Sequence, residues 1–121
     1  MGSQGDVESW YVKGFGLLQQ GKYMEAIRAF DKGLSINPND SKTWSLKGSA
    51  YMDLGKYEKA YESYDHVLHV YPDDPDTLLA KANSLYYLGR CEEAITICER
   101  VLKTDPENYL AQLYLDQAKK K

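Results

Sequence analysis

The fold is decided by residues 44–72, WSLKGSAYMDLGKYEKAYESYDHVLHVYP, which contain every part of a helical hairpin. Apolar residues recur at helical spacing, as at Trp44 and Tyr51, and mark the buried face of a first helix. Gly55 follows and can adopt the left-handed backbone conformation that ends a helix. A second helix begins near Tyr57, and the final proline ends it, because the residue before a proline disfavours the α conformation. The segment therefore predicts two antiparallel helices.

The same pattern occurs three times, in blocks of 34 residues that begin at Val7, Ser41 and Pro75 (7 + 34 = 41; 41 + 34 = 75). Block position 4 then holds Trp10, Trp44 and Leu78. Further aligned columns are Gly14, Gly48 and Ala82; Gly21, Gly55 and Gly89; Ala26, Ala60 and Ala94; Phe30, Tyr64 and Cys98; Pro38, Pro72 and Pro106. Self-similarity at this period indicates an array of stacked hairpins.

Two columns predict how each hairpin packs. The small residues Gly14, Gly48 and Ala82 on the first helices are expected to face Ala26, Ala60 and Ala94 where the two backbones approach closely. Position 7 carries Lys13, Lys47 and Lys81. We expect the aliphatic part of each lysine to lie over the core with its ammonium group in water.

With a period of 34, Trp at position 4, Gly or Ala at 8, Ala at 20, Phe or Tyr at 24 and Pro at 32, residues 7–108 resemble the tetratricopeptide repeat. The resemblance implies an all-α fold: a right-handed superhelix of three antiparallel helix pairs plus a capping helix. Expected units are a disordered leader at residues 1–6, repeats at 7–40, 41–74 and 75–108, and the capping helix at 109–121. In this last helix Leu110, Leu113 and Tyr114 are expected to form the apolar face.

Composition excludes several functions. Hydrophobic residues make up 43% of the chain and the net charge is −3, so the chain is foldable but lacks the basic surplus of nucleic-acid-binding modules. No apolar run approaches the length of a membrane span. The two cysteines, Cys91 and Cys98, occupy core columns and are interpreted as buried free thiols, which indicates a reducing compartment, the cytoplasm. We therefore expect neither a nucleic-acid nor a membrane partner.

Catalytic motifs are not recognisable in the sequence. It has no phosphate-binding loop, no HExxH pair and no GxSxG turn. His66 and His69 are three residues apart but have no third metal ligand nearby, so we interpret them as exposed surface residues. The prediction is a non-enzymatic protein without cofactor or metal, whose partner is a protein or peptide.

The family resemblance also implies where a partner binds, because the first helices of such repeats form an inner, concave wall. Its exposed positions, 2, 5, 9, 12 and 13 of each block, include Asp53, Asp76 and Tyr87. From this wall and the last helix we select as the candidate peptide-binding groove Tyr11, Phe15, Leu18, Ser45, Ser49, Met52, Leu79, Asn83, Tyr86, Leu110 and Leu113.

The composition of this wall predicts its ligand. The best-known members of the family hold the C-terminal carboxylate of heat-shock chaperones with Lys, Arg and Asn at five positions, which here hold Tyr11, Phe15, Leu46, Asp76 and Ala80. The wall is instead rich in apolar and aromatic residues, so we expect an apolar peptide or helix rather than a chaperone tail. The alternative is a structural module that forms homo-oligomers through its repeat ends or its C-terminal helix.

Overall fold

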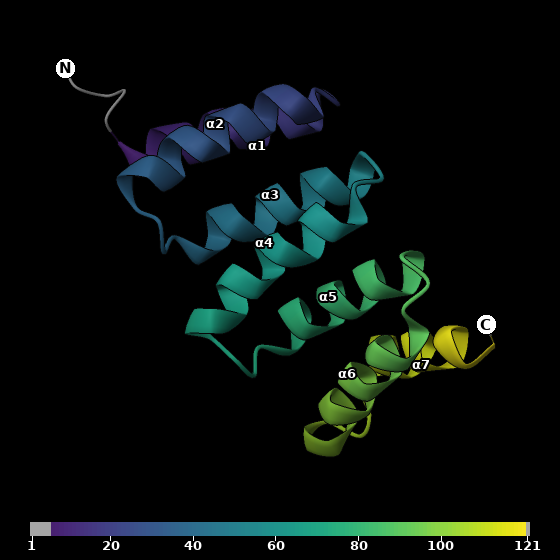
Figure 1. Ribbon diagram of the computed structural model, residues 1–121. Helices are drawn as coiled ribbons and strands as arrows, with labels where there is room; N and C mark the ends of the chain where they lie inside the picture. The colour runs from purple at the N-terminus through teal and green to yellow at the C-terminus, as the bar shows by residue number, and fades with distance from the viewer. Residues whose placement is uncertain (1–5, 121) are drawn as a thin grey trace.

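The computed structural model describes residues 6–120, and these residues form seven α-helices without a strand. Successive helices pair as antiparallel hairpins, and each hairpin packs on the next along the chain (Figure 1). This arrangement confirms the predicted all-α solenoid of three helix pairs and a final single helix. The helices are α1 (Val7–Gln19), α2 (Tyr23–Ile36), α3 (Ser41–Asp53), α4 (Tyr57–Val70), α5 (Pro75–Tyr87), α6 (Cys91–Thr104) and α7 (Tyr109–Lys120).

The turn inside each hairpin is built as the sequence predicts. Gly21, Gly55 and Gly89 are the residues with positive φ, at 76°, 76° and 83°, in the described part of the chain. In the second hairpin the amide of Lys56 donates to the carbonyl of Tyr51 over 2.9 Å, and equivalent bonds close the other two turns. Because the left-handed conformation carries no Cβ penalty in glycine, these positions set the tight return of the chain.

The side chains of aspartate residues cap the N-termini of α1 and α5 by accepting hydrogen bonds from backbone amides. The carboxylate of Asp74 accepts a hydrogen bond from the amide of Thr77 at 3.1 Å, with Pro75 at the first helical position, as predicted. Asp6 plays the same part for α1 and accepts from the amides of Glu8 and Ser9. Residues 1–5 of the expected leader lie outside the described part of the chain.

The small residue at position 8 makes room for the ring at position 24. A Cβ atom added at Gly48 would lie 2.5 Å from Cε1 of Tyr64, and one added at Gly14 would overlap the ring of Phe30. Phe30 is fully buried and Tyr64 almost so. In the third hairpin, where Ala82 replaces glycine, the smaller Cys98 replaces the ring. Packing therefore couples columns 8 and 24 within each repeat.

Two of the position-7 lysines join adjacent repeats. Nζ of Lys47 lies 2.7 Å from a carboxylate oxygen of Asp31, and Nζ of Lys81 lies 2.8 Å from one of Asp65. Each aspartate belongs to the second helix of the preceding repeat. The sequence expectation of an ammonium group in water did not include these ion pairs, because the carboxylate comes from the stacked repeat. The Lys13 ammonium lies 5.4 Å from the centroid of the Trp10 ring on its own helix.

A cluster of buried core residues lies at the C-terminal end, where α5, α6 and α7 meet. Its buried residues are Leu78, Leu79, Ala82, Leu85, Ala94, Cys98, Val101, Ala111, Leu115 and Ala118. The expected apolar face of α7 was therefore wrong for Leu110 and Leu113, which are exposed, while Tyr114 is half-buried. Packing between repeats decides this: Ala111, Leu115 and Ala118 stand in the columns of Thr77, Lys81 and Ser84, which face the preceding repeat.

The two thiols have different environments. Cys98 is fully buried, and burial raises the pKa of its thiol to about 11, whereas Cys91 at the start of α6 is half-buried. Only the thiolate reacts with alkylating reagents. Iodoacetamide is therefore expected to modify Cys91 in the native protein and Cys98 only after unfolding, as measured by mass spectrometry of the digested protein. Equal native labelling rates at both cysteines would contradict the packing described for α6.

Candidate functional site

The first helices of successive repeats lie next to one another, since α1 contacts α3 and α5 contacts α7. At the N-terminal end of this row, the rings of Tyr11 and Phe15 are parallel with their centroids 6.5 Å apart. Nζ of Lys42 lies 4.8 Å from the Tyr11 ring centroid and 3.0 Å from a Glu8 carboxylate oxygen. Phe15 is 43% exposed. This end of the wall therefore presents an aromatic surface whose one lysine is already paired with an acid.

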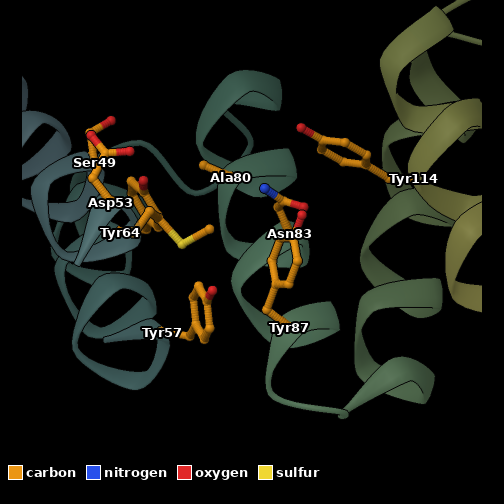
Figure 2. Close-up of a pocket in the computed structure, with 9 residues that line it drawn as sticks. Ser49, Asp53, Tyr57, Tyr64, Ala80, Asn83, Tyr87 and Tyr114 are labelled. Atoms are coloured by element: carbon orange, nitrogen blue, oxygen red, sulfur yellow. The ribbon is translucent and has the colours of Figure 1, made fainter. Parts of the chain in front are cut away.

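A hollow of about 440 Å³ opens further along the row, and we call it the groove pocket. Figure 2 shows residues of α3 and α4 on one side, Ala80 and Asn83 of α5 at the centre, and Tyr114 of α7 reaching in from the other side. The pocket thus joins two repeats and the final helix. Its lining residues are Ser49, Met52, Asp53, Tyr57, Tyr64, Ala80, Asn83, Tyr87 and Tyr114.

Three residues of the candidate groove, Ser49, Met52 and Asn83, line this pocket together. The other members lie elsewhere. Leu18 and Ser45 are half-buried on α1 and α3, and Leu110 and Leu113 are exposed on α7.

Two predicted groove residues belong mainly to the core. Leu79 is only 2% exposed, so the expectation that it lies on the wall was wrong. It is part of the cluster formed by α5, α6 and α7, which draws this branched apolar side chain inward. Tyr86 is half-buried and packs against the same cluster, with its ring edge towards the ring of Tyr87 at a centroid distance of 5.2 Å. Tyr87 is therefore the exposed aromatic residue at this position, with 53% of its surface accessible.

The candidate groove predicted from the sequence does not include the tyrosines that line the groove pocket. The rings of Tyr57 and Tyr87 stack with centroids 5.1 Å apart, although they belong to different repeats (Figure 2). Position 13 was among the exposed wall positions, so Asp53 and Tyr87 were within reach of the sequence pattern. Tyr57 and Tyr64 lie on a second helix, and Tyr114 lies on the last one. No pattern within a single repeat indicates that these side chains meet in one pocket.

The pocket is rich in oxygen atoms and carries one full charge. The buried ring of Tyr64 is hydrogen-bonded through its hydroxyl to Ser49, and burial, opposed by this bond, raises the pKa of Tyr64 above its ordinary value. The Asp53 charge adds to that rise. Burial likewise raises the pKa of Tyr114. Tyr64 and Tyr114 are therefore neutral phenols at neutral pH, and Asp53 contributes the one carboxylate of the lining.

Within residues 6–120, no group of three or more His, Cys, Asp or Glu side chains lies together in a way that could hold a metal ion. His66 instead stacks on Trp44, with ring centroids 3.7 Å apart. Across the same residues, no helix is both long enough and apolar enough to cross a membrane.

The chain is similar to several proteins of known structure. Structural similarity is strong to the first tetratricopeptide domain of Spaghetti (RPAP3) bound to the HSP90 peptide SRMEEVD, at 26% identity and TM-score 0.87, covering 95% of this chain and 91% of that one. The first such domain of human RPAP3 is 25% identical with a TM-score of 0.85, and the match covers 98% of this chain and 93% of that one. MamA of Desulfovibrio magneticus RS-1 is 24% identical with a TM-score of 0.84, and the match covers 96% of this chain and 70% of that one. This similarity supports the fold alone.

Sequence comparison gave two results. No curated protein sequence matched the chain significantly. Two family models described as tetratricopeptide repeat match residues 17–84 and 79–115, which together include parts of all three hairpins and most of α7. The first match alone spans more than half of the chain. This chain belongs to the tetratricopeptide repeat family.

Proposed function

We propose that the chain is a protein-interaction module that binds a peptide segment of a partner along the wall formed by α1, α3, α5 and α7. The observation that carries the proposal is the groove pocket, a hollow lined by four tyrosines and a methionine from two adjacent repeats and α7. Tyrosine and methionine are enriched at the centres of protein interfaces. A hollow of this size accommodates one or two side chains of a peptide laid across the row of helices.

The similarity to peptide-binding relatives supports the general function. The first domain of Spaghetti (RPAP3) is bound to a peptide, and it shares 26% identity with this chain over nearly its whole length. The family is in general made of non-catalytic interaction modules. A peptide partner is therefore the class of ligand that the fold favours.

The charge of the wall favours a different peptide from the one in that relative. The peptide SRMEEVD is acidic, whereas this wall carries Asp53 and Asp76 without an ion-pair partner among residues 6–120. Its single paired lysine, Lys42, is neutralised by Glu8. The exposed aromatic surface at Phe15 and Tyr87 complements apolar side chains. We therefore propose a partner segment with apolar anchors and without a C-terminal carboxylate requirement.

Self-assembly through the C-terminal helix is less favoured than peptide binding. Ala111, Leu115 and Ala118 already pack into the core cluster of their own chain, so an exchange of α7 with a second copy would first have to break these contacts. The two exposed leucines of α7, Leu110 and Leu113, extend the proposed wall instead. A peptide ligand therefore uses surface that the fold leaves open.

The proposal is tested with peptides selected from a random displayed library against the purified protein. Replacing Phe15 and Tyr87 together by serine is expected to weaken the selected peptides at least tenfold, because two exposed aromatic anchors are lost. Affinity is measured by isothermal titration calorimetry, and far-UV circular dichroism checks that the helices are retained.

The matched control replaces two equally exposed apolar residues of the second helices, Met24 and Val70, by serine. This control variant is expected to bind like the unmodified chain. Equal loss of binding in both variants, or loss in the control alone, would place the binding surface on the second helices and remove the proposal.

A further inference from the structure

We infer that the groove pocket is a binding site for a cationic side chain, a lysine or arginine of the partner segment, held by the Asp53 carboxylate and the tyrosine rings. The inference rests on the proposed function and names the chemistry that the central part of the wall recognises. It goes beyond apolar complementarity, because the lining of this pocket differs from the aromatic surface around Phe15.

Among the residues that the structure describes, the groove pocket contains an acidic residue and no basic residue. Its lining comprises one carboxylate, four phenol groups, one amide, one hydroxyl and one thioether, and none of the lining residues is a lysine, arginine or histidine. Across residues 6–120, the Asp53 carboxylate has no lysine, arginine or histidine nitrogen within ion-pair distance. An anion placed here would meet a carboxylate without any neutralising cation. The electrostatics therefore select a positive charge.

Three tyrosines outside the pocket have a cation of the chain close to their rings. Outside the pocket, the ring of Tyr11 has the Lys42 ammonium 4.8 Å from its centroid, and the Tyr61 ring has the Arg90 guanidinium carbon at 5.1 Å. Lys47 lies 5.9 Å from the ring of Tyr51. None of these intramolecular cation–π contacts involves a pocket tyrosine. Three rings outside the pocket thus face cations of the chain itself, whereas the exposed pocket ring of Tyr87 has no such cation among residues 6–120 and can contact an external one.

Aromatic rings and polar groups lie on different sides of the groove pocket. Tyr57 and Tyr87 stack on each other and form one aromatic side, and Tyr87 is more than half exposed (Figure 2). Tyr114 and Asn83 present a hydroxyl and an amide from α7 and α5. A long cationic side chain that enters beside Tyr87 contacts a ring with its methylene groups. Its charged end then reaches oxygen acceptors and the field of Asp53.

The test uses a capped lysine amide as the probe, with its neutral counterpart, capped Nε-acetyllysine amide, as the matched ligand. Titration into the ¹⁵N-labelled full chain is expected to shift the backbone amide resonances of Asp53, Asn83 and Tyr87 with the cation only. Asp53→Asn and Tyr87→Leu are each expected to weaken this binding by roughly threefold to tenfold. Asp105→Asn, which changes an exposed aspartate at the C-terminal end of α6 and outside the wall, is the control and is expected to leave this binding unchanged.

Each outcome separates this inference from the proposed function. Equal shifts with the neutral ligand, or an unchanged affinity in Asp53→Asn, would overturn the cation site. Library peptides that bind the wall without any enrichment of lysine or arginine would also overturn it, while the peptide-binding function would stand. A capped lysine that binds in the pocket, together with a failure of every library peptide to bind, would support the site and remove the proposed function.

Discussion

Replacing Phe30 with alanine is expected to lower the free energy of unfolding by about 3–5 kcal/mol, the usual cost of deleting a buried aromatic side chain. The Phe30 side chain is fully buried, and its ring occupies the space above Gly14 between α1 and α2. Removing it leaves a cavity that the two helices cannot close without losing their other contacts. Urea denaturation followed by far-UV circular dichroism measures the change. Met24→Ala, an exposed change on the same helix, serves as the control and is expected to have an effect within about 0.5 kcal/mol.

Substitutions at Gly14 and Phe30 are expected to be energetically coupled, because the Phe30 ring fills the space next to Gly14. Gly14→Ala alone is expected to destabilise the chain by about 1–3 kcal/mol, because the added methyl group overlaps the ring. In a Phe30→Cys background the same change is expected to cost much less, since the third repeat already combines Ala82 with Cys98. A double-mutant cycle with these two changes measures the coupling. Additive effects would show that the ring does not occupy the space assigned to it.

Leu115→Ala in the last helix is expected to destabilise the chain by about 2–5 kcal/mol. Leu115 is 6% exposed and belongs to the core cluster that α5, α6 and α7 share. Loss of this contact loosens α7 from the third repeat, and α7 carries Tyr114 of the groove pocket. The same variant should therefore also weaken binding in the pocket. Denaturation in urea gives the stability change.

The matched control for this prediction is Leu113→Ala, which removes the same atoms from the same helix two residues away. Leu113 is 39% exposed, and its replacement is expected to change stability by only about 0.5 kcal/mol. A larger loss for Leu113 than for Leu115 would mean that α7 packs through the face that the sequence first indicated. Comparable losses would mean that α7 has no single buried face.

Local signals made most of the fold predictable. The glycine turns, the helix ends before each proline and the Asp74 cap each depend on a few neighbouring residues, and the structure confirms all three. The face of α7 depends instead on the preceding repeat. Its register was available from the columns of Thr43 and Thr77, which are buried between repeats and align with Ala111. Hydrophobicity alone pointed to larger side chains that face solvent.

The candidate site was less predictable because its parts come from different repeats. Three residues selected from the aligned columns, Ser49, Met52 and Asn83, line one pocket in the structure. Tyr57 begins the second helix of one repeat and meets Tyr87 of the next, a contact that depends on how the two hairpins pack rather than on any spacing within one. Leu79 shows the converse: its column faces the wall, but the neighbouring helices bury it. Pocket composition therefore had to come from the packed array.

The most direct test of peptide binding along the first helices is a ¹H–¹⁵N chemical-shift map of the intact chain with a selected peptide. The account predicts that the perturbed amides lie on α1, α3, α5 and α7, with Phe15, Asn83 and Tyr87 among them. Perturbations confined to α2, α4 and α6, with the amides around the groove pocket unmoved, would contradict it.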